Sequence, residues 1–235
     1  MARYTSVWGL LGVLVAGCPV PAVAQGTGAS LQAVAGRLDL TAAGAGQWRN
    51  ALGVSPGRAA PERLLAVSPA GQVLRTQDGT ESSVALGLEL DLLLLDDRQT
   101  IVLVHNHPGN ASLSANDLAQ LAKPGVAAVV AIGHDSSLYM AARGPRYDVD
   151  GFEPRQYEVA RGEIKKRLLT ERGAGAVTLA GGDAHFSHLA ALALAKAGII
   201  EYRARLATGS RASFELSRVA FGHVAAGAAG ALGRR

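Results

Sequence analysis

Residues 104–117 decide the fold and the chemistry of this chain, and they read VHNHPGNASLSAND. The apolar run Ile101–Val104 stands directly before the first histidine and predicts a buried β-strand over 101–107. Because alternate side chains of a strand point to the same face, His105 and His107 are expected to project together. The stretch therefore predicts two neighbouring imidazoles at the end of a strand.

A carboxylate follows these imidazoles at the start of a predicted helix. Residues 108–110 (Pro-Gly-Asn) favour a turn, and Ser114 is suited to cap a helix over roughly 115–122. Asp117 falls in the first turn of that helix, from where its side chain can swing back toward the histidines. Imidazole nitrogens and carboxylate oxygens are preferred zinc ligands, and catalytic zinc usually keeps three protein ligands and one open position. The spacing predicts a Zn²⁺ site.

The pattern His-x-His-Pro followed by Ser-x-x-Asp resembles the JAMM (MPN-plus, JAB-domain) zinc metallopeptidases. The loop between His107 and Ser114 is shorter than in most members and is similar to the loop of bacterial and phage-associated JAB domains. The resemblance covers roughly residues 61–143. It implies a JAB/MPN core of the cytidine-deaminase-like type.

The family resemblance also implies a general base, which in these enzymes is a glutamate on an early strand. Glu62 opens the predicted strand Arg63–Val67 and matches that place. Glu81, which precedes another predicted short strand, and Glu89, in a predicted helix, are the alternatives. The base takes a proton from water and passes it to the leaving amine, which is the chemistry of a hydrolase.

Ser114 has an implied catalytic role as well, since the family serine donates a hydrogen bond to the oxyanion of the tetrahedral intermediate. The same hydroxyl can be a plain helix cap, and the two roles are compatible. Ser112 replaces it only if the loop is aligned two residues earlier, which loses the Ser-x-x-Asp pairing with Asp117.

The core is predicted to belong to the α/β (α+β) class, with a mixed β-sheet and flanking helices over residues 61–145. Its order is strand, strand, helix, strand, helix, strand, strand. The predicted strands are 63–67, 72–76, 101–107, 126–132 and 137–143, and the predicted helices are 89–97, which is apolar and expected to be buried, and 115–122.

Residues 146–235 are expected to form a helical C-terminal extension. Residues 153–172 are charged with a helical period, and residues 183–197 form a second helical pattern that Gly198 ends. The end of the chain, from Ala220, is rich in glycine and alanine and is expected to be loosely ordered.

Other histidines offer a weaker alternative metal site. Asp183, His185 and His188 lie close together, and the two histidines would share a helix face. Capping of a helix by Asp183 is a sufficient explanation of this cluster. His134 is expected in an exposed turn, and no role is assigned to His223.

Residues 1–24 are similar to a secretory signal peptide. The apolar segment Val7–Cys18 is followed by the cleavage pattern Ala-Val-Ala at 22–24. The alternative is a lipoprotein, in which a lipidated Cys18 would anchor the chain to a membrane. Cys18 is the single cysteine, so the mature protein needs no disulfide. Residues 25–60 are predicted to be a linker or a short helix.

The expected function is an exported, periplasmic or secreted zinc peptidase or isopeptidase that acts on a peptide or protein, with cell-wall peptides among the candidate substrates. The net charge is +4, and Lys165–Arg167 is the single tight basic cluster, so no nucleic-acid partner is expected. The alternatives are a non-catalytic MPN-type binding module and a RadC-like DNA-associated protein. A carboxylate above the metal distinguishes an enzyme from a scaffold.

Overall fold

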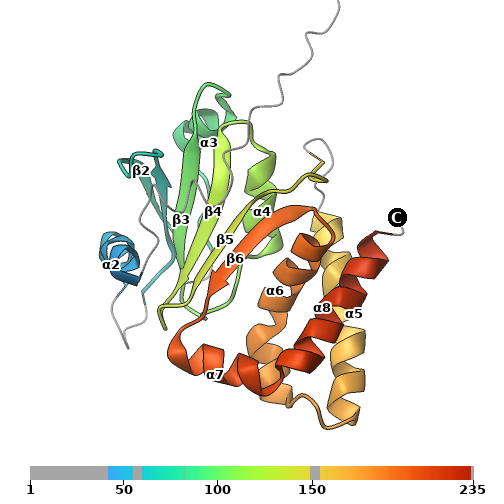
Figure 1. Cartoon of the computed structure of the whole chain (residues 1–235). Helices are drawn as coiled ribbons and strands as arrows, with labels where there is room; N and C mark the ends of the chain where they lie inside the picture. Colours follow the sequence, from blue (N-terminus) through green and yellow to red (C-terminus); the bar gives the residue numbers. More distant parts are fainter. Residues whose placement is uncertain (1–41, 55–59, 82, 149–153, 234–235) are drawn as a thin grey trace, which may run out of the picture.

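The structure is a computed structural model that describes residues 42–54, 60–81, 83–148 and 154–233 (Figure 1). In this part of the chain six strands form one mixed sheet, and seven α-helices pack around it. The predicted α/β class is confirmed. The strands are β1 (Arg63–Val67), β2 (Val73–Asp78), β3 (Ile101–His107), β4 (Val126–Gly133), β5 (Leu138–Arg143) and β6 (Ile200–Arg205). The helices are α2 (Ala42–Ala51), α3 (Leu88–Leu95), α4 (Ala115–Ala119), α5 (Pro154–Gly173), α6 (Leu179–Lys196), α7 (Thr208–Leu216) and α8 (Arg218–Leu232), with a 3-10 turn η1 at Gln120–Ala122.

The sheet places the histidine strand in its interior. Its strand order is β2-β1-β3-β4-β5-β6, in which β3 and β4 are parallel and the other neighbours are antiparallel. Every residue of β3 is buried, which explains its continuous apolar run, because a strand covered on both faces does not alternate in polarity. The five strands and two helices predicted between residues 61 and 145 occur, with small shifts in their bounds. The short strand expected after Glu81 was wrong, because residues 83–87 form neither strand nor helix.

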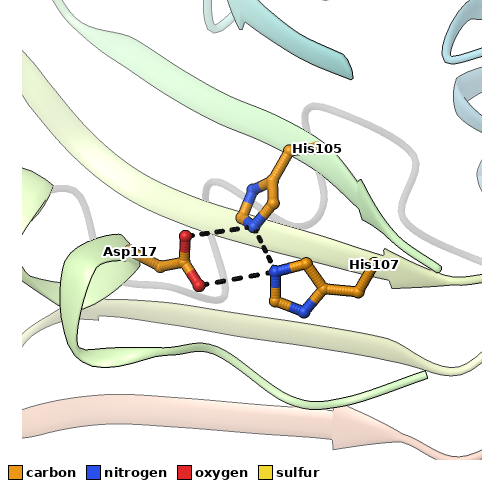
Figure 2. A group of neighbouring side chains, drawn as sticks. All are labelled: His105, His107 and Asp117. Carbon is orange, nitrogen blue, oxygen red and sulfur yellow. Dashed lines mark hydrogen bonds and ion pairs between the residues drawn. The ribbon is translucent and has the colours of Figure 1, made fainter. Parts of the chain in front are cut away.

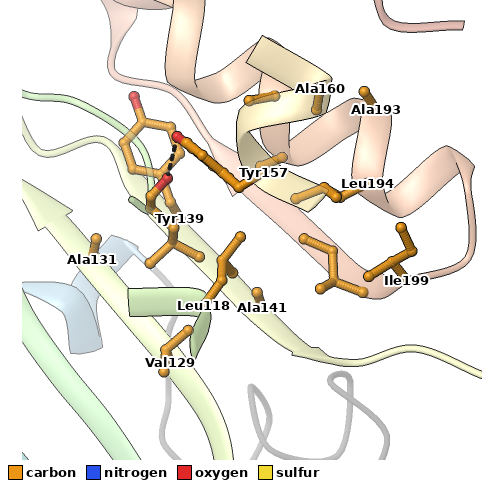
Figure 3. Close-up of a cluster of buried hydrophobic side chains, with 14 of the residues drawn as sticks. Leu118, Val129, Ala131, Tyr139, Ala141, Tyr157, Ala160, Ala193, Leu194 and Ile199 are labelled. Carbon is orange, nitrogen blue, oxygen red and sulfur yellow. Dashed lines mark hydrogen bonds between the residues drawn. The ribbon is translucent and has the colours of Figure 1, made fainter. Parts of the chain in front are cut away.

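The two faces of the sheet carry different layers. Helix α2 lies on one face, where Trp48 and Leu52 pack against Val102 and Val104 of β3. The other face carries the larger core, to which α3, α4, α5, α6 and α8 contribute, with α8 packed on α5 and α6 (Figure 1). Figure 3 shows part of this core, with residues of β4, β5 and α4 facing residues of α5 and α6. The labelled members are Leu118, Val129, Ala131, Tyr139, Ala141, Tyr157, Ala160, Ala193, Leu194 and Ile199.

The C-terminal part is not helical throughout, because it also contributes an edge strand. Strand β6 pairs antiparallel with β5, so residues after 146 extend the sheet. Helix α6 begins at Leu179 with Thr178 as its cap, so the prediction that Asp183 caps this helix was wrong. The helix ends as predicted: Gly198 has φ +75°, and the amides of Gly198 and Ile199 donate back to carbonyls of the last turn.

The prediction of a loosely ordered end from Ala220 was also wrong. Helix α8 runs from Arg218 to Leu232 and buries Phe221 and Val224 against α5 and α6. Alanine is the strongest helix former, and small residues let helices approach one another closely. A glycine- and alanine-rich composition here builds a packed helix.

Helix α3 is less buried than predicted. Leu90 and Leu94 enter the core, whereas Leu88, Leu92 and Leu95 are 75%, 59% and 51% exposed. Only one side of α3 therefore faces the core.

The predicted signal peptide lies outside the described residues, as do residues 25–41 and 55–59 of the segment predicted to be a linker or a short helix. Helix α2 falls in the segment that was predicted to be a linker or a short helix. Among the described residues, no helix has the length and apolar character needed to cross a membrane.

Substituting Gly144 by alanine is expected to destabilise the protein by about 1–3 kcal/mol, the range typical of overpacking. A Cβ at this position would lie 2.5 Å from the carbonyl oxygen of Gly198, and that backbone has no free rotation by which to give way. Gly162→Ala in α5 is the matched control, because its Cβ would contact nothing within 4 Å. Urea unfolding should give a lower midpoint for G144A alone. Equal midpoints for G144A and the wild type would contradict the close approach.

Candidate metal centre

The register of β1 and β3 brings Glu62 to the face that carries the two histidines. Leu64 pairs with His105, and the antiparallel register continued by two residues sets Glu62 opposite His107. Paired residues share a face of the sheet, so Glu62, His105 and His107 project to one side. This side is the one on which α4 packs.

His105, His107 and Asp117 converge on one point, as Figure 2 shows. The Nε2 atoms of the two histidines are 2.8 Å apart. The Asp117 carboxylate places Oδ1 3.2 Å from Nε2 of His105 and Oδ2 3.5 Å from Nε2 of His107. Ligand atoms of a tetrahedral zinc ion lie roughly 3.3 Å apart, given bonds of about 2.0–2.2 Å. The three side chains therefore have the spacing and the donor types that fit such an ion.

A capping box fixes the carboxylate. Ser114 caps α4 as predicted: its backbone N–H donates to Oδ2 of Asp117 at 2.6 Å, and the Asp117 N–H donates to Oγ of Ser114 at 3.2 Å. The hydroxyl acts as an acceptor in this arrangement, so its own proton remains available to a further partner. Helix capping and a catalytic hydrogen bond are thus compatible at Ser114.

A hydrogen bond from outside the triad orients the His107 ring. Nδ1 of His107 lies 2.8 Å from the carbonyl oxygen of Ala111. A carbonyl only accepts, so Nδ1 carries the proton and Nε2 presents its lone pair to the triad. His105 and His107 are 4% and 8% exposed, and Nδ1 of His105 has no hydrogen-bond partner among the described residues.

Burial and charge shift the pKa values of the site residues. Burial would raise the pKa of Asp117, but His105 and His107 hold it well below its usual range. Burial disfavours the charged form of His107, yet its hydrogen bond and ion pair with Asp117 raise its pKa. Burial raises the pKa of Glu62, and the positive field of His107 and His105 opposes part of this rise. The charges of the triad therefore influence the pKa of Glu62.

The triad opens into a cleft of about 670 Å³. Glu62, His107, Ser114 and Asp117 line the cleft on the side of the sheet and α4, and residues of α5 and α6 line it on another side. Glu81, the second candidate base, also lines the cleft and is exposed. Glu89 is exposed on α3 and does not line it. The cleft contains two of the three predicted candidate bases.

Sequence reasoning missed how the loop between His107 and Ser114 is supported. The four tyrosines of the described residues all hydrogen-bond to this loop or to α4, although they come from β5, α5, β6 and the segment between β5 and α5. Their partners are the Asn110 carbonyl for Tyr139 (3.2 Å), the Leu113 carbonyl for Tyr157 (3.0 Å), the Ser112 hydroxyl for Tyr202 (2.8 Å) and the Leu118 carbonyl for Tyr147 (3.1 Å). The Ser112 side chain thus has a structural partner. The C-terminal part of the chain supports the loop between His107 and Ser114.

The second histidine group has the contacts of core residues. His188 places Nδ1 2.7 Å from the Tyr202 hydroxyl, and both His185 and His188 pack edge-on against Phe214. Asp183 is exposed on the same helix. Within the described residues, the group formed by His105, His107 and Asp117 is the one cluster with metal-binding geometry.

The remaining histidines have no place in the site. His134 is partly buried, rather than exposed as expected, and His223 is exposed on α8. The structure therefore brings together the three predicted ligands, with Ser114 and Glu62 in the same cleft.

Comparison of the chain with protein-family models, with curated proteins and with solved structures finds no match.

Proposed function

We propose that this protein is a zinc-dependent hydrolase of amide bonds, a peptidase or isopeptidase of the JAMM type with a JAB/MPN core. The observation that carries the proposal is the convergence of His105, His107 and Asp117 beside a half-buried glutamate in an open cleft. Two imidazoles and one carboxylate are a ligand set that zinc accepts while it keeps a position open. When bound, the ion lowers the pKa of a water molecule and so supplies a nucleophile near neutral pH.

The residues of the chain divide the remaining work. The Glu62 carboxylate accepts a proton from the attacking water as the C–O bond forms, and it delivers this proton to the leaving nitrogen as the C–N bond breaks. The raised pKa of Glu62 suits a group that must both take and release a proton. The Ser114 hydroxyl donates a hydrogen bond to the carbonyl oxygen as negative charge develops there, a contribution worth about 10²–10³ in rate.

A binding module of the MPN type is the second candidate. Such a scaffold needs no proton acceptor beside the ligands, and the position of Glu62 opposite His107 therefore favours the enzyme. The cleft has a volume typical of ligand sites. The predicted signal peptide would bring the enzyme to cell-wall peptides or other exported polypeptides.

Removal of the metal is expected to abolish hydrolysis reversibly. The purified protein should contain about one zinc ion per chain by elemental analysis, and a chelator should stop cleavage of a fluorescence-quenched peptide library. Addition of one equivalent of zinc should restore cleavage, because the described ligands form a single cluster. Cleavage that persists in metal-free protein would contradict the proposal.

A further inference from the structure

Asn106 lies between the two histidine ligands but points to the opposite face of the sheet, because side chains alternate along β3. It is fully buried. Its Nδ2 donates to the carbonyl of Pro61 at 3.0 Å, and its Oδ1 accepts the N–H of Arg63 at 2.7 Å. These two peptide groups stand on either side of Glu62.

The position of Glu62 in the sheet makes this contact important. Backbone pairing between β1 and β3 reaches only as far as Leu64 and His105, so Glu62 lies beyond the last paired residue on that side. Toward the hairpin partner, the backbone of Glu62 is paired through the Thr80 carbonyl (2.7 Å) and the Gly79 amide (2.8 Å). On the side of β3, the hydrogen bonds of the Asn106 side chain to Pro61 and Arg63 replace the backbone hydrogen bonds that β1 and β3 do not make there.

We propose that Asn106 is a positioning residue, which fixes the backbone around Glu62 and thereby sets the reach of its carboxylate to the triad. The inference rests on the proposed function. Asn106 shares β3 with His105 and His107, so one strand places both the ligands and the base. A side chain that bridges a carbonyl and an N–H needs one donor and one acceptor, which an amide supplies without adding charge.

His134 adds a third contact to this amide. Its Nε2 lies 3.3 Å from Nδ2 of Asn106, in position to accept the second amide proton. The Asn106 side chain is thus held from three directions, and its orientation is fixed. The fixed side chain therefore holds the backbone of Pro61 and Arg63 in place relative to β3.

Asn106→Ala is expected to lower kcat by roughly 10–100-fold with little change in KM, because small misplacement of a catalytic group is costly. Zinc content should stay at about one ion per chain. In a Glu62→Gln background the same substitution should cost nothing further, since the two changes act through one group. Asn106→Asp keeps an acceptor for the Arg63 N–H but sets a carboxylate oxygen against the Pro61 carbonyl at a fully buried position. It is therefore expected to lose at least as much kcat as N106A.

Thr178→Ala is the matched control, because it removes another hydrogen bond from a side chain to the backbone, at the cap of α6. Its kcat should equal that of the wild type. Amide hydrogen exchange gives a second measurement that does not depend on catalytic activity. The Arg63 N–H should exchange at least about 10-fold faster in N106A, whereas the Ile101 N–H, which donates to the Gly125 carbonyl at the other end of β3, should not.

The outcomes separate the two proposals. If hydrogen exchange at the Arg63 N–H is unchanged in N106A, Asn106 does not fix the backbone around Glu62, whatever the activity. Faster exchange with unchanged kcat, or an equal loss of kcat in the Glu62→Gln background, overturns the positioning of the base. A wild-type protein that binds zinc but hydrolyses no peptide overturns the proposed function, and the positioning role falls with it.

Discussion

His107→Ala is expected to yield a folded protein that no longer retains zinc. The substitution removes one of three ligand atoms, and the two that remain, from His105 and Asp117, cannot close a tetrahedral site. Loss of an outer hydrogen-bond partner alone typically lowers metal affinity about 10–100-fold. Removal of the ligand itself should therefore lower zinc affinity more than 100-fold. Elemental analysis after dialysis should find less than a tenth of the zinc found in the wild type.

A histidine outside the site is the control for this experiment. His223 is exposed on α8, so His223→Ala should keep one zinc ion per chain and full activity. Circular dichroism of both variants establishes that the fold is intact. Equal zinc in the wild type and in H107A would remove His107 from the ligand set and the triad from the proposed mechanism.

The cluster of His105, His107 and Asp117 could be predicted because its signals are local. Strand β3 and the cap of α4 lie within one short stretch, and each has a strong signature: an apolar run for the strand and a serine three residues before an aspartate for the cap. The face shared by His105 and His107 follows from strand geometry alone. Glu62 could be placed only through the family resemblance, since its approach to His107 depends on a register that no local pattern encodes.

The support of the site could not be predicted, because it depends on contacts between distant residues. Tyr202 contacts Ser112 across 90 residues of sequence, and Tyr157 contacts Leu113 across 44. No periodicity marks a tyrosine whose hydroxyl reaches a loop elsewhere in the chain. Strand β6 was missed for a similar reason: it is an edge strand with several charged, exposed residues, and its pairing with β5 spans two helices.

Glu62→Gln should retain zinc and the fold while hydrolysis falls by about 10²–10⁴-fold. Glutamine has nearly the same shape as glutamate but does not accept a proton at neutral pH. The backbone hydrogen bonds of Glu62 with Thr80 and Gly79 do not involve the substituted atoms. The same holds for the bonds of the Asn106 side chain with Pro61 and Arg63. The expected change is therefore confined to kcat.

Glu81→Gln separates the proton acceptor from a general effect of charge, because Glu81 lines the same cleft and carries the same charge. If the negative field of the cleft were what mattered, the two variants would lose similar activity. Proton transfer demands contact, and burial together with the charges of His107, His105 and Asp117 shifts the pKa of Glu62. A large loss in E81Q with full activity in E62Q would move the base to Glu81, and loss of zinc in E62Q would make Glu62 a ligand. Loss confined to E62Q would establish Glu62 as the group that moves the proton.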